Sequence, residues 1–342
     1  MAAAEKLKRV ELALAALGPL EASCTLCPRN CGVDRGRGGL GVCRTGRQAL
    51  VSHALLHFGE EPVLSGTADV RQDGPAPEVS RGGGFAGGGR SGSGTVFFAG
   101  CNLKCLFCQN YQLSWLDEGE PVSDEALAGM MLDLQEQGAL NINLVSPTHV
   151  VLPVLRGLRA AYAGGLEVPL VWNSNGYDGL EALQALDGIV DVYLPDLKYH
   201  SPHVAGRYSG AADYFDHAAR ALREMSVQQP VLDLGRDGVA RRGLIVRHLM
   251  LPGHVDETLF LLRWIKENLS PLVGLSLMSQ YHPAHKAPAE LRRAVGPEEY
   301  RRAADLALSL GFEHLFLQPE PFPAEDHLLP DFKRRVPFRW NK

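Results

Sequence analysis

The stretch from residue 95 to about residue 318 alternates short apolar runs with longer amphipathic segments. Strands are expected at residues 95–99, 140–145, 168–172, 189–194, 244–251 and 273–279, with a further short run at 314–318. Helices are expected at residues 123–137, 150–163, 178–187, 211–226, 256–269 and 297–310. Successive strand–helix units favour a parallel sheet with right-handed crossovers. Six units instead of the eight of a closed barrel predict an α/β fold, an incomplete (β/α)6 TIM-like barrel.

The segments around this repeat differ in composition. Residues 1–60 form an N-terminal cysteine-rich segment, within which residues 4–17 have the apolar spacing of a helix. Residues 67–94 are largely Gly, Ser, Pro and Asp, which cannot bury apolar surface, so we expect a flexible Gly-rich insertion there. The barrel is assigned to residues 95–320, with a hairpin at 231–243, and residues 321–342 are assigned to a C-terminal tail.

Net charge and cysteine usage limit the class of protein. The formal net charge is −5, whereas nucleic-acid binders usually carry a basic excess, so nucleic acid is not an expected partner. No apolar run reaches the roughly 18 residues of a membrane span, so no membrane partner is expected. All seven cysteines lie in the first third of the chain. That clustering is untypical of a secreted disulfide framework and indicates a reducing compartment, the cytoplasm.

Three cysteines follow the first expected strand with C-x3-C-x2-C spacing: Cys101, Cys105 and Cys108. Thiolates are the usual protein ligands of iron–sulfur clusters, and a [4Fe–4S] cluster has four irons. Three thiolates on one loop leave one iron open to a small molecule, and an open coordination position distinguishes a reactive metal site from a structural one. The alternatives are a zinc clip or buried unligated thiols, which explain such close spacing less well.

Four further cysteines lie nearer the N-terminus in the pattern C-x2-C-x3-C-x11-C: Cys24, Cys27, Cys31 and Cys43. Four thiolates can close a tetrahedral zinc site or hold a second iron–sulfur cluster, and ligand softness does not decide between the two. A segment of this size has little core, so bound metal would supply much of its folding free energy. We therefore expect an N-terminal cysteine-rich metal knuckle.

Polar side chains follow the expected strands at the carboxyl ends, where a barrel places its chemistry. Taken singly, each has an ordinary explanation as a turn residue or a surface ion pair. Their shared location instead predicts one site for a polar ligand. The residues are Ser146 and Thr148 after the second strand, Asn173 and Asn175 after the third, Asp196 and Lys198 after the fourth, and Arg247 in the fifth.

The cysteine triplet resembles the signature of the radical S-adenosylmethionine (radical SAM) superfamily. The chain is similar to a family of uncharacterised iron–sulfur proteins related to pyruvate formate-lyase activating enzyme, over residues 24–33, 94–111, 141–149, 191–199, 247–253 and 276–281. Two features depart from the pattern. Many radical SAM enzymes carry Gly-Gly-Glu where this chain has Ser146-Pro147-Thr148, and residues 67–94 look like an insertion.

The resemblance implies a [4Fe–4S] cluster on the triplet, with S-adenosylmethionine (SAM) on the open iron through its amino and carboxylate groups. Lys198 or Arg247 could pair with the SAM carboxylate. Asp196, Asn173 or Asn175 could hydrogen-bond the ribose. Ser146 and Thr148 could hold the ammonium group. The assignment of the last pair is weakened by the missing Gly-Gly-Glu.

The implied activity is reductive cleavage of SAM followed by hydrogen abstraction from a substrate. In an activating enzyme that substrate is a glycine of a partner protein, and a small molecule is equally open. The expected electron donor is flavodoxin- or ferredoxin-like. The alternative is a non-catalytic iron–sulfur electron-transfer or metal-binding scaffold protein, which explains the cysteines but not the polar strand ends. A nucleic-acid-modifying radical enzyme would bind RNA in a salt-sensitive way, which the acidic balance disfavours.

Overall fold

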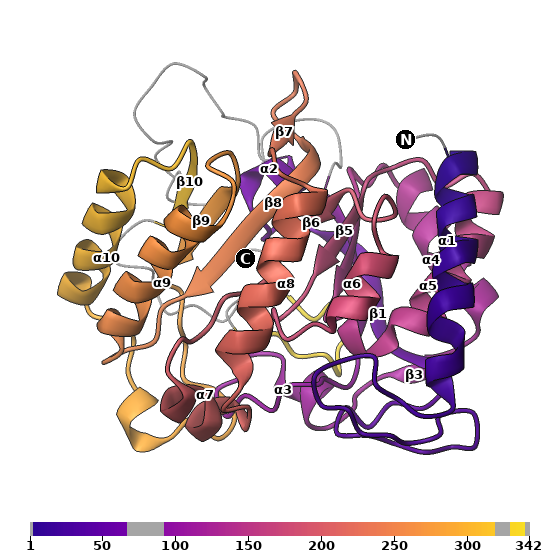
Figure 1. The fold of residues 1–342 in the computed structure, drawn as a ribbon, viewed down its shortest axis with the longest axis horizontal. Coiled ribbons are helices and arrows are strands. Elements are labelled where there is room, and N and C mark those ends of the chain that lie inside the picture. Colours follow the sequence, from indigo (N-terminus) through magenta and orange to yellow (C-terminus); the bar gives the residue numbers. More distant parts are fainter. Residues whose placement is uncertain (1–2, 67–91, 319–328, 339–342) are drawn as a thin grey trace.

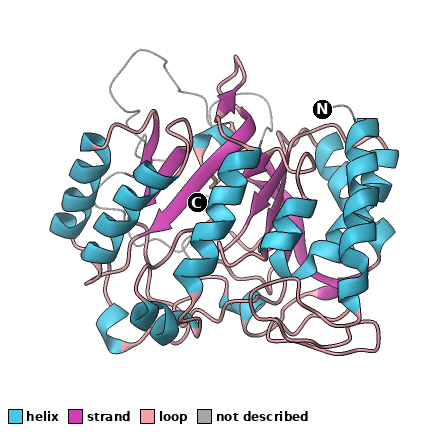
Figure 2. Ribbon diagram, viewed as in Figure 1, coloured by secondary structure: helices cyan, strands magenta, loops and turns pink. Residues whose placement is uncertain are grey.

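A single mixed sheet forms the centre of the molecule (Figures 1 and 2). The computed structural model describes residues 3–66, 92–318 and 329–338. Its ten strands are arranged in the order β10-β9-β8-β6-β5-β4-β2-β1-β3, with β7 beside β8. Their bounds are β1 Ala49–His57, β2 Ser93–Phe98, β3 Glu120–Val122, β4 Ile142–Val145, β5 Leu170–Asn173, β6 Val192–Tyr193, β7 Asp233–Leu234, β8 Ala240–Leu249, β9 Gly274–Met278 and β10 His314–Leu317.

All of the strands expected from the repeat are present, including the one near the C-terminus. Strands β2, β4, β5, β6, β8, β9 and β10 pair in parallel, which confirms the α/β class. Strand β1, which the sequence analysis did not predict, pairs antiparallel with β2 and with β3. The cysteine-rich N-terminal segment therefore contributes a strand to the same sheet.

Helices cover the sheet and follow its strands, as Figure 1 shows. The six expected helices correspond to α4, α5, α6, α8, α9 and α10, and they differ from prediction by only a few residues at their ends. In the described ranges, no helix combines the length and apolar character needed to cross a bilayer. The bounds are α1 Ala3–Leu17, α2 Pro62–Ser65, α3 Tyr111–Ser114, α4 Asp124–Glu136, α5 Val151–Ala163, α6 Leu180–Ala185, α7 Pro202–Ser209, α8 Tyr214–Gln228, α9 Val255–Asn268 and α10 Pro297–Ser309.

Strand β2 shows why the sheet needs cover on both faces. Successive side chains of a strand point to opposite faces. Val96 and Phe98 belong to the main core with the helices, whereas Phe97 belongs to a separate cluster with Leu113 and Phe332. All six residues of β2 are buried, and burying one such apolar side chain is worth about 1.5–3 kcal/mol. The strand that leads into the cysteine triplet is therefore firmly anchored.

Residues 329–338 pack against β2 and against α3, the helix that follows the cysteine triplet. The backbone N–H of Phe332 donates to Gln112 Oε1 at 2.6 Å, and Gln112 Nε2 donates to Asp331 Oδ1 at 3.1 Å. The ring of Phe332 lies 5.3 Å from that of Phe97, and the ring of Phe338 lies 4.5 Å from that of His57. Helix α3, which follows the triplet, is thus fixed by a segment more than two hundred residues away in sequence.

Two further predictions have clear outcomes. The hairpin at 231–243 is present as β7 and the start of β8, with Gly238 in a left-handed conformation (φ 74°) at its turn. Strand β8 begins at Ala240, earlier than the predicted 244, because it continues the hairpin into the parallel sheet. The predicted Gly-rich insertion, apart from residues 92–94, lies outside the described residues, as does much of the predicted C-terminal tail.

Candidate functional site

The carboxyl ends of the parallel strands reach one edge of the sheet, and both cysteine-bearing loops lie there. In Figure 1 this is the lower edge, where α3, α7 and the indigo N-terminal loop are found. The triplet loop (residues 100–110) follows β2, and the front loop (residues 22–48) precedes β1. Gly100 permits their close approach: its φ is 84°, and a Cβ there would lie 2.6 Å from the Cys43 carbonyl oxygen.

Each sulfur of the triplet has a separate hydrogen-bond donor aimed at it. Asn175 Nδ2 lies 3.4 Å from Cys101 Sγ. Ser209 Oγ lies 3.0 Å from Cys105 Sγ and Ser114 Oγ lies 3.2 Å from Cys108 Sγ. The donors come from the β5 end, from α7 and from α3, so the loop is held from three directions. A thiolate accepts hydrogen bonds and does not donate them, so these donors suit the ionised, metal-binding form.

Burial and mutual repulsion act on the triplet sulfurs. Burial is the main cause that raises the pKa of Cys108 to about 12 and raises the pKa of Cys101, and the neighbouring Cys105 raises both further. Three thiolates held this close need a cation to stabilise them together. A [4Fe–4S] cluster fits this donor set, because it takes one thiolate per iron and accepts hydrogen bonds at sulfur. The fit is one of donor chemistry, with each thiolate on a different iron: within the described residues, no three or more His, Cys, Asp or Glu side chains are gathered around one metal-ion position.

Beside the triplet, Asp196 is held between two cations. Lys198 Nζ lies 2.7 Å from Asp196 Oδ2 and Arg247 Nε lies 3.1 Å from Asp196 Oδ1. Arg247 also donates to Asn173 Oδ1 at 2.6 Å. Burial alone would raise the pKa of Asp196, but the two cations outweigh it and lower that pKa. The structure thus brings together four of the predicted site residues in one buried charged network: Asn173, Asp196, Lys198 and Arg247.

The same network includes a glutamate that the sequence analysis missed. Glu60 Oε2 lies 3.4 Å from Arg247 Nη1. It follows β1, a strand that was not predicted, so no sequence signal placed it near the barrel. Burial raises the pKa of Glu60 while the Arg247 guanidinium opposes that rise. Arg247 is therefore shared among Asp196, Asn173 and Glu60 and is fixed in position.

Thr148, one of the two residues predicted for the SAM ammonium, lies in a different environment. Thr148 Oγ1 donates to Asp178 Oδ1 at 2.5 Å, and Ser174 Oγ donates to Asp178 Oδ2 at 2.6 Å. Trp172 Nε1 adds a third donor at 3.3 Å. Burial raises the pKa of Asp178 against these hydrogen bonds. Thr148 thus ties the ends of β4 and β5 together through Asp178, and Ser146 lies at the β4 end with a left-handed φ of 58°.

Asn175 connects the triplet loop to the front loop through a residue that the sequence analysis did not single out. Asn175 Nδ2 donates to Asn102 Oδ1 at 2.8 Å in addition to contacting Cys101 Sγ. The Asn102 side chain donates to the Tyr177 carbonyl oxygen at 2.6 Å, and the Asn102 backbone carbonyl oxygen accepts from Arg29 Nε of the front loop at 2.8 Å. Asn102, which lies between Cys101 and Cys105, therefore contacts both Asn175 and the front loop.

The front loop contains its own donors to sulfur. Arg35 Nη2 lies 3.3 Å from Cys43 Sγ, and the Val42 N–H lies 3.4 Å from Cys31 Sγ. Cys24, Cys27 and Cys43 are buried, and Cys31 is partly exposed. Burial raises the pKa of Cys27 to about 12, with Cys43 and Cys24 adding to the rise. These three sulfurs therefore lie within electrostatic reach of one another.

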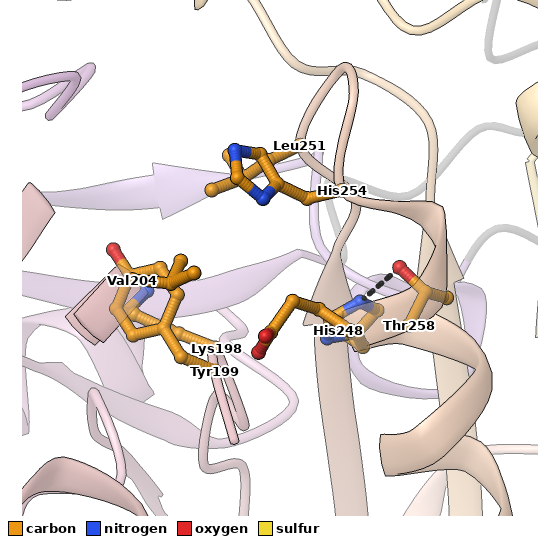
Figure 3. Close-up of a pocket in the computed structure, with 8 residues that line it drawn as sticks. Lys198, Tyr199, Val204, His248, Leu251, His254 and Thr258 are labelled. Atoms are coloured by element: carbon orange, nitrogen blue, oxygen red, sulfur yellow. Dashed lines mark hydrogen bonds between the residues drawn. The ribbon is translucent and has the colours of Figure 1, made fainter. Parts of the chain in front are cut away.

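A small hollow lies next to the charged network. Figure 3 shows Tyr199 and Val204 on one side of it and His248 and Thr258 on the other. His248 Nε2 lies 2.9 Å from Thr258 Oγ1, and its Nδ1 lies 2.6 Å from the Leu197 carbonyl oxygen. The space between these side chains has a volume of about 0 Å³ for a water-sized molecule, whereas ligand pockets usually have roughly 300–1,000 Å³. Lys198 lines this hollow, but the hollow by itself is too small for a ligand of the size of SAM.

Comparison with known proteins gives two sequence relatives. No protein-family model matches the chain. The uncharacterized protein MJ0674 of Methanocaldococcus jannaschii is 30% identical over 298 residues, which cover 83% of this chain and 74% of that protein. The uncharacterized protein MJ0808 of the same organism is 23% identical over 308 residues, which cover 87% of this chain and 81% of that protein.

Two solved structures of Streptococcus suis SuiB are also similar. SuiB bound to S-adenosylmethionine superposes with a TM-score of 0.45 at 10% identity, over 64% of this chain and 48% of SuiB. SuiB bound to the precursor peptide SuiA gives a TM-score of 0.44 at 9% identity, over 64% of this chain and 46% of SuiB. The chain thus spans about half the length of the SuiB chains that it matches.

Proposed function

The chain belongs to the family of the uncharacterized protein MJ0674, and we propose that it is a radical SAM enzyme. The observation that carries the proposal is the triplet itself. Cys101, Cys105 and Cys108 lie on one loop at a strand end, and a separate donor contacts each sulfur. The buried Asp196–Lys198–Arg247 network lies beside that loop.

The triplet would hold a [4Fe–4S] cluster with one iron left for SAM. When both are bound, they supply a one-electron reductive cleavage of SAM, which yields 5′-deoxyadenosine once a hydrogen atom has been taken from a substrate. The protein's part is to hold the ligands in position and to keep water away from the reacting atoms.

Lys198 lies between Asp196 and the triplet cysteines, where SAM bound to the cluster would bring its carboxylate. It contacts Asp196, and the nearby thiols act on it electrostatically: Cys105 helps to raise the pKa of Lys198, and Lys198 opposes the rise in the pKa of Cys108. A cation between the two groups is suited to a ligand carboxylate. Asp196 stays ionised between its two cations, so it can accept hydrogen bonds from ribose hydroxyls.

The roles of the remaining predicted contacts follow from their present partners. Asn173 is oriented by Arg247 and presents its amide N–H groups to a ligand. Asn175 and Thr148 are engaged with Cys101 and Asp178, so we assign them to support of the site. Ser146 remains the candidate for the SAM ammonium.

For the substrate, the resemblance to glycyl-radical activating enzymes favours a glycine of a partner protein, with a small molecule as the alternative. A flavodoxin- or ferredoxin-like protein in the cytoplasm would supply the electron. The second function considered, an iron–sulfur electron carrier without turnover, would leave the buried ion network beside the triplet without a ligand.

The test is SAM turnover by the reconstituted protein. Full-length protein loaded with iron and sulfide under anoxic conditions is mixed with SAM and dithionite, and 5′-deoxyadenosine is measured by chromatography. We expect its formation in the native protein and its loss in Cys105→Ala. An intact cluster spectrum without any 5′-deoxyadenosine would leave the electron-carrier function in its place.

A further inference from the structure

The Cys105 sulfur lies at the end of a chain of two hydroxyl groups. Ser209 Oγ donates to Cys105 Sγ at 3.0 Å, and Tyr199 Oη lies 2.8 Å from Ser209 Oγ. A serine hydroxyl has one proton to donate. Because Ser209 donates its proton to the sulfur, the proton between the two hydroxyls belongs to Tyr199. The chain therefore runs in one direction, from Tyr199 through Ser209 to Cys105.

Both hydroxyl-bearing residues are shielded from water. Ser209 is fully buried, and Tyr199 is 1% exposed. Burial raises the pKa of Tyr199 well above that of an ordinary tyrosine, so its hydroxyl keeps the proton that it donates. Hydrogen bonds are stronger in such surroundings than in water, and successive donors in a chain strengthen one another. The Ser209 hydroxyl is thus a stronger donor to sulfur than an isolated serine would be.

Backbone contacts hold Ser209 against the triplet loop. The N–H of Leu106, next to Cys105, donates to the Tyr208 carbonyl oxygen at 2.8 Å. Ser209 is the last residue of α7, and Gly210 follows it in a left-handed conformation (φ 61°) as the helix cap. The end of α7 and the triplet loop therefore form one unit, in which the Ser209 hydroxyl is fixed at the sulfur.

Tyr199 belongs to the segment that carries the charged network. It follows Asp196 and Lys198 along the chain, and its ring packs edge-on against the ring of Tyr214, with centroids 5.5 Å apart. Tyr214 Oη in turn accepts from the Lys198 backbone N–H at 3.0 Å. One segment after β6 thus serves both the ion network and, through the Tyr199 hydroxyl, a sulfur of the triplet.

The other two sulfurs of the triplet have longer contacts. Ser114 Oγ donates to Cys108 Sγ at 3.2 Å, and Asn175 Nδ2 lies 3.4 Å from Cys101 Sγ. Within the described ranges, no side chain donates to the Ser114 hydroxyl as Tyr199 donates to Ser209. Of the two hydroxyl donors to sulfur, Ser209 is therefore the one that a second hydroxyl strengthens.

From these contacts we infer that Tyr199 and Ser209 set the reduction potential of the cluster proposed for the triplet, with Tyr199 acting through Ser209. The inference rests on the proposed function, which places a [4Fe–4S] cluster there. One-electron reduction adds negative charge to the cluster and its thiolates, so a donor to sulfur stabilises the reduced form more than the oxidised form. The electron comes from the external donor, and no proton moves. Both are positioning residues, since they act through Cys105 and not on a reacting atom.

A redox titration of the reconstituted protein tests the pair. Full-length protein loaded with iron and sulfide under anoxic conditions is titrated with dithionite without SAM, and the reduced cluster is followed by EPR. The triplet signal is identified by its loss in Cys105→Ala. We expect Ser209→Ala to lower the equilibrium constant for reduction about tenfold, or about 59 mV for one electron. Ser209→Thr, which keeps the hydroxyl, should stay near the native value, and an unchanged potential in Ser209→Ala overturns the inference.

The order of the chain is tested by a double variant. Tyr199→Phe keeps the ring and removes the hydroxyl, so we expect the same equilibrium constant to fall about threefold, or about 28 mV. If Tyr199 acts through Ser209, the protein with both changes should match Ser209→Ala alone. No shift in Tyr199→Phe, or a double variant whose shift equals the sum of the single shifts, overturns the relay.

Two variants of the same kind serve as controls. Tyr162→Phe, on α5, removes a buried hydroxyl that has no hydrogen-bond partner in the described part of the chain. Ser226→Ala, on α8, removes a hydroxyl that accepts from the Ser270 N–H and contacts no sulfur of the triplet. Neither change should alter the potential.

The two proposals fail separately. The titration is run without SAM and reports on the potential, whereas 5′-deoxyadenosine formed with excess dithionite reports on the proposed function. Formation of 5′-deoxyadenosine by native protein together with an unshifted potential in Ser209→Ala would remove only the relay. A shifted potential without any 5′-deoxyadenosine from native protein would remove the radical SAM assignment and leave the relay.

Discussion

The two cysteine loops lie against each other but are stabilised by different means. The triplet loop continues from a fully buried strand, and its sulfurs are contacted by residues from α3, α7 and the β5 end. Residues 22–48 of the front loop contain no helix or strand, and the donors to their sulfurs, Arg35 and the Val42 N–H, come from the loop itself. The comparison indicates that the fold positions the triplet before any metal binds, whereas a metal at the front loop, if the prediction for these cysteines holds, would supply much of that loop's stability.

Loss of one triplet thiolate should have the largest effect. Cys105→Ala removes one iron ligand and leaves Ser209 without its sulfur partner, so we expect complete loss of cluster absorption and of SAM cleavage. Cys31→Ala, in the partly exposed position of the front loop, is the control that should retain the triplet cluster. Retention of both signals in Cys105→Ala would show that the triplet does not hold the cluster.

Loss of a front-loop thiolate should affect the two loops differently. Because bound metal supplies folding free energy to small cysteine-rich segments, Cys27→Ala should make the bonds after the partly buried Arg29 and the buried Arg35 cleavable by trypsin in the folded protein. The triplet loop should stay resistant, since β2 and the segment 329–338 hold it. Mass spectrometry of timed digests gives the order of cleavage. Equal resistance of the front loop in native and variant protein would contradict its dependence on metal.

Asp178 tests how much of the strand-end geometry is independent of metal. Asp178→Ala leaves the donors of Thr148, Ser174 and Trp172 buried without their acceptor. We expect the free energy of unfolding to fall by about 3 kcal/mol, measured by urea denaturation of the metal-free protein. Asp178→Asn, which keeps one acceptor oxygen, should lose less. A loss below 1 kcal/mol in Asp178→Ala would mean that the site tolerates rearrangement.

His149 lies at the seam of the two loops and should make stability depend on pH. Burial lowers the pKa of His149 from 6.5 to about 4. His149 in the unfolded chain therefore takes up a proton near pH 6.5, whereas in the folded protein it stays neutral until about pH 4. The free energy of unfolding therefore falls as pH decreases from 6.5 towards 4. Between pH 7 and pH 5 the loss is about 2 kcal/mol. The free energy of unfolding is measured by urea titration at pH 7 and at pH 5. It should fall by this amount more in native protein than in His149→Gln, and an equal fall in both proteins would exclude the effect.

The smallest expected effect concerns the ligand. Lys198→Met keeps the apolar part of the side chain and removes the cation beside Asp196. We expect SAM affinity to fall about tenfold, or about 1.4 kcal/mol, with the cluster spectrum unchanged. Isothermal titration under anoxic conditions measures the affinity, and the control is Lys266→Met on α9, where the ammonium group bonds the Gly311 carbonyl oxygen away from Asp196. Unchanged affinity would take Lys198 out of the ligand site.

Much of the fold could be predicted because its signals are local. Apolar runs and helix ends located seven parallel strands and six helices. The carboxyl-end rule predicted a shared location for Asn173, Asp196, Lys198 and Arg247, which hydrogen bonds and ion pairs join in the structure. The cysteine spacings located the two loops. These features depend on residues close in sequence or on the regular repeat of one strand per unit.

Features that depend on distant packing could not be predicted. Strand β1 has partly polar, irregular burial and pairs antiparallel outside the repeat, so Glu60 beside Arg247 was missed. Asp178 and Asn102 look like turn residues, and only their donors and acceptors reveal what they connect. The contact of Asp331 and Phe332 with Gln112 joins segments with no shared pattern.

That last contact has a consequence for biosynthesis. Helix α3 closes the loop that carries the triplet, yet the groups that fix Gln112 leave the ribosome more than two hundred residues later. During translation the thiols of Cys101, Cys105 and Cys108 are therefore available to assembly factors before their support is complete. Residues 329–338 would then dock after the cofactor has been inserted and would hold α3 in place.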